Sequence, residues 1–215
     1  ILSAYTALTG KTPMPPKWAL GYQQCRYSYY PDKEVIRLAK TFREKEIPAD
    51  TIYLDIHHME EFKVFTFDKK KFAKPAELIK HLKDLGFRVV VILDPGIKVD
   101  KEYLPYTEGN DKHLFLKYPD EENYEGQVWP GWCVFPDFTN PETRDWWADK
   151  VNFYLEAGVD GFWTDMNEPA TWGQTIPDLV QFFYEGQKVS HKKGRNVYGL
   201  QMARSTKNGL IKYNK

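Results

Sequence analysis

Short apolar runs alternate with amphipathic stretches along most of this chain of 215 residues, and that alternation limits the possible fold more than any other feature. The clearest apolar runs lie at residues 51–56, 87–93 and 159–163, and residues 18–24 form a weaker one. Runs without polar alternation are typical of strands that are covered on both faces, as in parallel sheets. We therefore expect an α/β fold in which helices cover a parallel sheet.

Helical periodicity lies between these runs and after them. The expected helices cover residues 32–45, 75–85, 141–157, 176–190 and 198–206. Asp32 and Asn140 are expected to cap the first and third of these helices, with Pro141 at the first helical position, and Gly86 follows the second. Residues 97–140 form a long aromatic and polar segment in which we expect no regular element.

The first residues of the chain are expected to stand apart from the rest. Residues 1–8 have the pattern of a helix that Gly10 stops, and three prolines before Trp18 impose an extended linker. We therefore divide the chain into two parts. Residues 1–16 are a helix that leads into the domain and a proline-rich linker, and residues 17–215 are the domain.

Three acidic residues mark the ends of the expected strands. Asp55, Asp94 and Asp165 each follow a different strand, and in a closed (β/α)8 barrel all such ends meet at one rim. No glycine-rich phosphate loop follows the first strand, which argues against an open doubly wound sheet. Only about four strands are expected, whereas a complete barrel takes roughly 250 residues. The sequence therefore predicts a partial (β/α)8 TIM barrel, roughly its first half, over residues 17–215.

The segment from Gly161 to Pro169 carries the strongest chemical signal. An apolar strand leads there directly into Asp165 and Glu168. Burying an unpaired carboxylate costs several kcal/mol, roughly, unless a partner neutralises it or a reaction uses it. The segment therefore indicates an active site, and the residues alone leave open which of the two carboxylates reacts.

Charge and composition exclude several classes of partner. The chain has 30 Lys plus Arg and 30 Asp plus Glu, so no net charge would attract nucleic acid or an anionic membrane surface. Its longest apolar run is far below the roughly 20 residues of a membrane span. Aromatic residues make up 16% of the chain, and several stand in polar loop sequence, where their faces suit the C–H faces of sugars.

No metal and no cofactor are expected. His57 and His58 follow Asp55, but adjacent histidines on an extended chain point in opposite directions, and no further His stands at ligand spacing. Cys25 and Cys133 are widely separated and have neither zinc-motif spacing nor the pattern of a disulfide framework. We expect both to be ordinary thiols.

Several blocks of sequence are specific when they are taken together. They are residues 15–24 (PPKWALGYQQ), 53–59 (YLDIHHM), 94–96 (DPG), 128–131 (VWPG), 163–169 (WTDMNEP) and 198–206 (YGLQMARST). In this order the blocks resemble glycoside hydrolase family 31, and its α-glucosidases in particular. The resemblance covers nearly the whole chain.

This resemblance implies hydrolysis of a terminal, non-reducing α-linked glucose by double displacement, with retention of configuration. In that family the Asp of the Trp-x-Asp-Met-Asn-Glu block is the nucleophile, which places this role on Asp165. Asp55 matches the carboxylate that accepts hydrogen bonds from hydroxyl groups of the terminal sugar. The residues that match the apolar lining of the pocket are Ile92, Trp129, Trp163 and Met166.

Three further residues are expected to support this site. Asp94 lies beside the rim and is expected to order the pocket, and Glu168 is expected to serve as a structural anchor. His57 stands where many α-glucosidases of the family carry a second Asp. A His near several carboxylates is expected to be protonated more readily, which would change leaving-group preference or pH behaviour.

One catalytic group of the family has no counterpart in this sequence. The family's general acid/base is an Asp in a Gly-Asp-Asn block, and neither this block nor the matching Arg and His of the pocket occurs in the 215 residues. Retaining hydrolysis needs both carboxyl groups. We therefore expect the chain to be a segment of a longer protein, with the rest of the barrel and the β-domains as partners, and a poor catalyst alone.

Alternatives remain open at this point. The main hypothesis is an enzyme that acts on α-glucosides or oligosaccharides. One alternative is an α-xylosidase of the same family, and another is a noncatalytic carbohydrate-binding or interaction fragment. A third alternative is that the isolated chain is only partly ordered, because an unclosed barrel would leave strand edges exposed. The compartment is unknown, and the lack of a signal or membrane segment slightly favours the cytoplasm.

Overall fold

The centre of the fold is a four-stranded parallel sheet. The computed structural model describes residues 1–173 and 175–213. In the sheet order β1-β2-β3-β7, every neighbouring pair is parallel. The strands are β1 (Gln23–Gln24), β2 (Thr51–Leu54), β3 (Arg88–Leu93) and β7 (Gly161–Thr164). This arrangement confirms the expected α/β class and the partial barrel.

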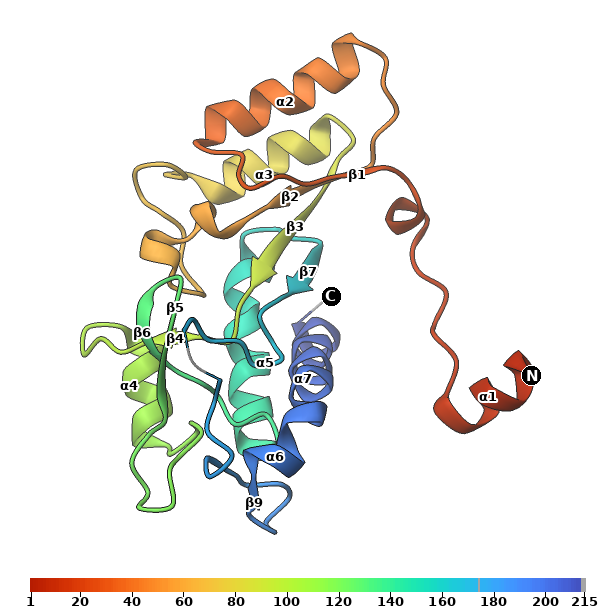
Figure 1. Cartoon of the computed structure of the whole chain (residues 1–215). Coiled ribbons are helices and arrows are strands. Elements are labelled where there is room, and N and C mark those ends of the chain that lie inside the picture. Colours follow the sequence, from red (N-terminus) through yellow and green to blue (C-terminus); the bar gives the residue numbers. More distant parts are fainter. Residues whose placement is uncertain (174, 214–215) are drawn as a thin grey trace.

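Helices connect the strands and cover the sheet. Figure 1 shows α2 (Asp32–Glu44) beside α3 (Pro75–Asp84), and α5 (Pro141–Glu156) beside α7 (Tyr198–Tyr213). Because each strand is followed by a helical crossover before its parallel neighbour, the chain repeats the βα unit of a (β/α)8 barrel.

The helix caps agree only in part with the prediction. The side chain of Asn140 accepts a hydrogen bond from the backbone N–H of Glu142, at 3.0 Å, and caps α5 as expected. The prediction that Asp32 caps α2 is wrong. Pro31 holds the cap position, and Asp32 is already the first helical residue, with its carboxylate accepting from the adjacent N–H of Lys33.

The pleat of the sheet separates two sets of strand residues. Residues that are in register in a parallel sheet point to the same side, so Tyr53, Ile92 and Trp163 share one face. The rings of Tyr53 and Trp163 lie 6.2 Å apart. Alternate residues such as Leu54 and Val91 belong to the other face and are almost fully buried in the main hydrophobic core.

The first strand is shorter than predicted. Residues 18–24 were expected to be extended, but Lys17–Leu20 form a 3-10 turn, in which the N–H of Ala19 bonds to the carbonyl of Pro16, and only β1 joins the sheet. Packing gives the reason. A Cβ atom on Gly161 would lie 3.5 Å from the ring of Trp18, so this ring fills space beside the start of β7.

The long segment after β3 is regular where no element was expected. It contains β4 (Ile97–Lys98), α4 (Leu104–Asp111), β5 (Glu125–Val128) and β6 (Gly131–Val134). The three strands form an antiparallel sheet of order β4-β6-β5. Strands β5 and β6 make a hairpin, and this hairpin carries Trp129 at its tip.

The prediction of a helix at residues 176–190 is wrong. The segment instead contains β8 (Gln181–Phe182) and β9 (Val189–Ser190), which pair as a hairpin. Distant groups take the backbone N–H groups that a helix would need: the N–H of Phe183 donates to Asp137 at 2.6 Å, and the N–H of Tyr184 donates to Thr139 at 2.8 Å. Because these acceptors lie about 45 residues away in sequence, local periodicity could not reveal them.

The segment after β9 is helical and longer than predicted. It starts with α6 (His191–Gly194) and a 3-10 turn (Arg195–Val197). These lead into α7, which continues to Tyr213, beyond the predicted end at residue 206. Among the residues that the structure describes, no helix is both long enough and apolar enough to cross a membrane.

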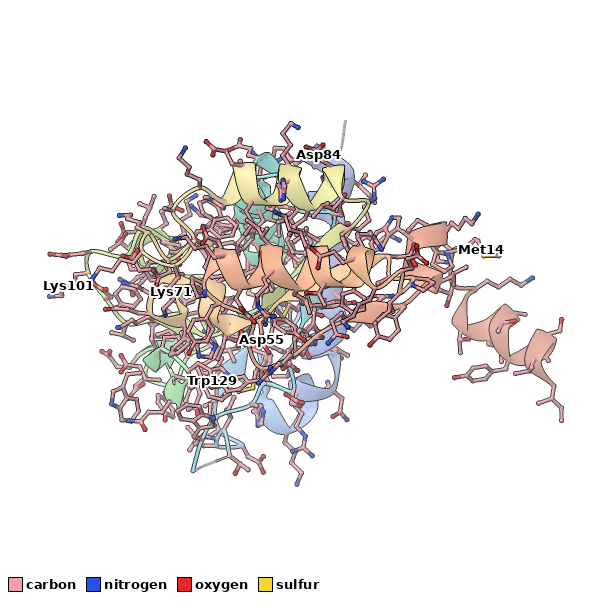
Figure 2. The ribbon with its side chains drawn as sticks, turned by 90° about the horizontal axis from the view of Figure 1, so that it is seen from above. Met14, Asp55, Lys71, Asp84, Lys101 and Trp129 are labelled. Carbon is pink, nitrogen blue, oxygen red and sulfur yellow. The ribbon has the colours of Figure 1, made fainter. Side chains whose placement is uncertain are left out.

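The N-terminal helix stands away from the body of the molecule. Helix α1 (Leu2–Thr9) contains no buried residue. In Figure 1 it lies apart from the sheet, and in Figure 2 Met14 marks the extended segment that leads to it. The division of the chain at residues 16 and 17 stays a prediction.

Candidate active site

Three carboxyl groups lie at one edge and on one face of the parallel sheet. Asp55, Asp94 and Asp165 follow β2, β3 and β7 directly. The register pairs Leu93 with Thr164, and the N–H of Asp165 continues the ladder by donating to the carbonyl of Leu93 at 3.1 Å. Since alternate strand residues share a face, the pairing places all three acids on the face of Ile92.

The three acids influence one another electrostatically. Asp55 and Asp94 are each only 7% exposed. Burial raises the pKa of Asp55, and the charge of Asp165 raises it further, against the lowering effects of the Ile56 N–H and His57. Burial, then Asp165 and Asp55, raise the pKa of Asp94 to about 7. A buried acid with a raised pKa beside other acids is typical of sites that move or hold protons.

Asp55 is held by a hydrogen-bond network that sequence reasoning missed. Its carboxylate accepts from the N–H of Ile56 at 2.7 Å, which begins a 3-10 turn at Ile56–His58. Its backbone carbonyl is 3.0 Å from Nδ1 of His58, and Nε2 of the same ring is 3.3 Å from the hydroxyl of Tyr154. A second 3-10 turn, Glu60–Phe62, follows.

The network fixes the protonation of His58. A carbonyl can only accept, so Nδ1 of His58 carries the hydrogen, and Nε2 accepts from the hydroxyl of Tyr154. That hydroxyl in turn accepts from the N–H of Phe65 at 3.0 Å. Burial lowers the pKa of His58 to about 4, in agreement with a neutral ring. The only sequence signal for His58 was its place beside His57, which suggested no such role.

His57 belongs to an aromatic cluster beside Asp55. Its ring stacks on Tyr30 at 4.5 Å and 2° and meets Tyr27 and Phe62 edge to face at 5.1 and 5.4 Å. The expectation that His57 protonates more readily is wrong. Burial and the charge of Lys71 lower its pKa and outweigh the opposite effect of the nearby Asp55.

Trp129 extends this aromatic cluster from the tip of the β5–β6 hairpin. Its ring is 6.0 Å from that of Tyr27 and stands nearly perpendicular to that of Trp172 at 4.9 Å. Figure 2 shows Asp55 and Trp129 on the same side of the molecule. Trp129 is half-buried and Trp172 is exposed.

The remaining predicted residues differ in their surroundings. Ile92 is fully buried in the main core, and Trp163 and Met166 are half-buried beside it. The backbone of Met166 has a left-handed φ of 57°, which turns the chain directly after Asp165. Glu168 is exposed and lines a separate hollow of about 760 Å³ between the loop that follows β7 and α7. None of the three rim acids lines that hollow.

No metal centre is found in residues 1–173 and 175–213, where no three His, Cys, Asp or Glu side chains are grouped to hold an ion. Cys25 is exposed and Cys133 is buried, and both are free thiols.

Comparisons with known proteins agree with this geometry. Residues 12–215 match the family model of the glycosyl hydrolases family 31 TIM-barrel domain. The chain is 48% identical over 214 residues to alpha-glucosidase 2 of Bacillus thermoamyloliquefaciens, covering 99% of the chain and 27% of that protein. It is 37% identical over 232 residues to an alpha-glucosidase of Saccharolobus solfataricus, covering 98% of the chain and 33% of that protein.

A solved structure matches the fold closely. The crystal structure of a glucosidase II alpha subunit aligns with a TM-score of 0.92 at 32% identity, covering 98% of this chain and 23% of that one. The chain therefore spans about a quarter to a third of the length of these proteins.

Proposed function

The chain belongs to glycoside hydrolase family 31, and on that basis we propose that it carries the nucleophile of a retaining α-glucosidase. The observation that supports this most is the placement of Asp55, Asp94 and Asp165 together on one face at the carboxyl edge of the sheet. In (β/α)8 enzymes the reacting groups come from the ends of several strands at this edge.

In the proposed reaction, ionised Asp165 attacks the anomeric carbon of the terminal glucose. A bond forms from its carboxylate oxygen to that carbon, while the bond to the leaving oxygen breaks and a general acid supplies that oxygen with a proton. Water, deprotonated by the same group, then releases the sugar and regenerates Asp165. We place the general acid on a segment of the longer protein outside these residues.

The other site residues bind the glucose in this proposal. Asp55 accepts hydrogen bonds from two sugar hydroxyls. The N–H of Ile56 holds its carboxylate and His58 holds its backbone carbonyl, and this limited freedom favours one epimer. The apolar faces of the ring contact the half-buried Trp129, Trp163 and Met166, which pack against the core that contains Ile92. Glu168 is exposed on a different hollow, so we assign it no contact with the sugar.

The sheet edges support a role for further strands. Among the described residues, β1 and β7 each pair with a strand on one side only. We propose that the remaining strands of the barrel close onto these edges, since an unpaired edge favours added strands. The hollow of about 760 Å³ beside α7 is a suitable place for part of that closure.

Covalent trapping tests the proposed nucleophile. The longer protein is treated with a fluorinated glucosyl fluoride or a cyclitol epoxide, and peptides are mapped by mass. We expect the label on Asp165, and no label in Asp165→Asn. The matched control is Asp100→Asn, which removes a half-exposed carboxylate that is ion-paired with Lys63. This variant should be labelled at Asp165 in the same way as the wild type.

Three results would contradict this proposal. Labelling of Glu168 or of another side chain in place of Asp165 would remove the assignment of the nucleophile. Sugar binding without any turnover by the longer protein would indicate the noncatalytic alternative. Faster turnover of a nitrophenyl α-xyloside than of the corresponding α-glucoside would change the substrate class to the α-xylosidase type.

A further inference from the structure

Asp94 occupies the middle of the site. It follows β3, which pairs with β2 on one side and β7 on the other, so Asp55 and Asp165 flank it. Its side chain is 7% exposed, and its Oδ1 atom is buried without a hydrogen-bond partner among the residues that the structure describes. A buried carboxylate in that position is unfavourable unless it is neutralised or used.

Nothing described around Asp94 supplies a compensating positive charge. The groups that interact with it are the two acids, the phenol of Tyr154 on α5 and the thiol of Cys133 on β6. Burial and the two acids together raise the pKa of Asp94 to about 7. Near neutral pH Asp94 can therefore hold a proton beside the other two acids.

Asp137 is a second buried acid of this chain and provides a comparison for the hydrogen bonding of Asp94. Asp137 is 5% exposed, but it accepts hydrogen bonds from the N–H of Thr139 at 3.0 Å, from its hydroxyl at 2.5 Å and from the N–H of Phe183 at 2.6 Å. These bonds and the charge of Arg144 oppose the effect of burial, which still raises the pKa of Asp137, and the bonds join two distant loops. Among the described residues no such set of donors surrounds Asp94, so its burial does not serve to join loops in the way that Asp137 does.

Resting on the proposed function, we propose that Asp94 is a positioning residue that acts through Asp165. It is a neutral carboxylic acid that donates its O–H to one oxygen of the Asp165 carboxylate in the sugar complex, which leaves the other oxygen aimed at the anomeric carbon. The hydrogen bond is charge-assisted and therefore strong. The proton stays on Asp94 throughout the reaction, so Asp94 adds no negative charge beside Asp165.

Infrared spectroscopy tests the protonation directly. Protein labelled with 13C at the Asp carboxyl groups is compared at about pH 6 and about pH 8, on either side of the Asp94 transition. We expect a band of a protonated acid at the lower pH that fades at the higher pH. The band should be missing in Asp94→Asn and retained in Asp100→Asn. A spectrum that is the same in Asp94→Asn and wild type would overturn the proposal.

The rate of covalent labelling at Asp165 tests the positioning. In the wild type this rate should fall as pH rises through about 7, because ionised Asp94 no longer donates. Asp94→Asn keeps a donor and should label within a few-fold of the wild type, without that pH dependence. Asp94→Leu keeps the branched shape of the side chain without a donor and should label about tenfold more slowly or worse.

The outcomes separate this inference from the proposed function. Equal labelling of the Leu and Asn variants would refute the donor role even if Asp165 is the nucleophile. If the wild type is not labelled at Asp165, the proposed function fails, and the positioning role fails with it. The infrared band then still decides whether Asp94 holds the proton.

Discussion

His58 links the backbone of Asp55 to Tyr154 on α5. Both nitrogens of its ring are engaged, one with the Asp55 carbonyl and one with Tyr154, and burial lowers its pKa from 6.5 to about 4. The unfolded chain therefore binds a proton at this His before the folded protein does. The contribution of neutral His58 is present above about pH 6.5 and is lost as the pH falls towards 4.

We expect the free energy of unfolding to decrease between about pH 7 and about pH 5, with up to roughly 2 kcal/mol of the decrease from His58. Urea denaturation at both pH values measures it. His58→Gln should be less stable at pH 7, because its hydrogen bonds are disturbed, but should show a smaller decrease. His113→Gln, at an exposed position, should keep the wild-type decrease. An unchanged pH dependence in His58→Gln would contradict this account.

At the scale of elements, the contact between α5 and α7 fixes the C-terminal part of the fold. Trp147 on α5 donates to the hydroxyl of Thr206 at 3.0 Å, and the hydroxyl of Ser205 donates to the carbonyl of Arg144 at 2.5 Å. Gly209 lets the helices approach closely. A Cβ atom at this position would stand 2.6 Å from the backbone oxygen of Ala148.

Gly209→Ala should therefore destabilise the protein, by about 1–3 kcal/mol, because the backbone of α5 has to move. Helix propensity alone predicts the opposite sign, since Ala favours a helix over Gly by about 1 kcal/mol. The exposed neighbour Asn208 provides the control: Asn208→Ala should stabilise by a few tenths of a kcal/mol. Thermal or urea unfolding compares the two. Stabilisation by both substitutions would show that the helices do not pack in this way.

The elements also show where local sequence suffices. The helices that begin at Asp32 and Pro75 follow amphipathic patterns, and Asn140 with Pro141 marks the start of the next one. The apolar run at Arg88–Leu93 forms a strand as predicted. Residues 176–190 have an acceptable helical pattern, yet side chains from the loop before α5 take their backbone donors. Local propensity was overridden there by hydrogen bonds to distant residues.

At the scale of the whole molecule, α1 is the part least connected to the rest. It buries no residue, whereas strands β2 and β3 lie in the main core. Its contribution to the stability of the described fold should therefore be small. This helix instead presents exposed Leu2, Tyr5 and Leu8.

Removal of residues 1–10 should leave the melting temperature within about 2 °C of the full chain, because no core contact is lost. Removal of residues 207–213 from α7 is the comparison, and it should lower the melting temperature clearly, since buried Gly209 and its contact with α5 are lost. Calorimetry measures both. A large decrease after the first truncation would mean that α1 is part of the domain and that the division at residues 16 and 17 is wrong.

The sequence by itself determined the α/β class, the partial barrel and the family. Strand and helix periodicities are local, and parallel strands place Asp55, Asp94 and Asp165 at a common edge whatever the detailed packing. Resemblance then distinguished Asp165 from Glu168, which the residues alone could not do. The role of Asp165 itself stays a proposal.

Only the tertiary structure decided the environments of the side chains. The pKa of Asp94, the neutrality of His57 and the His58–Tyr154 network depend on which groups of distant segments surround each residue and how far water is excluded. Burial and Coulomb interactions act through space, across contacts between residues far apart in the chain. A linear pattern does not contain these distances, so the chemistry of the site became visible only in the fold.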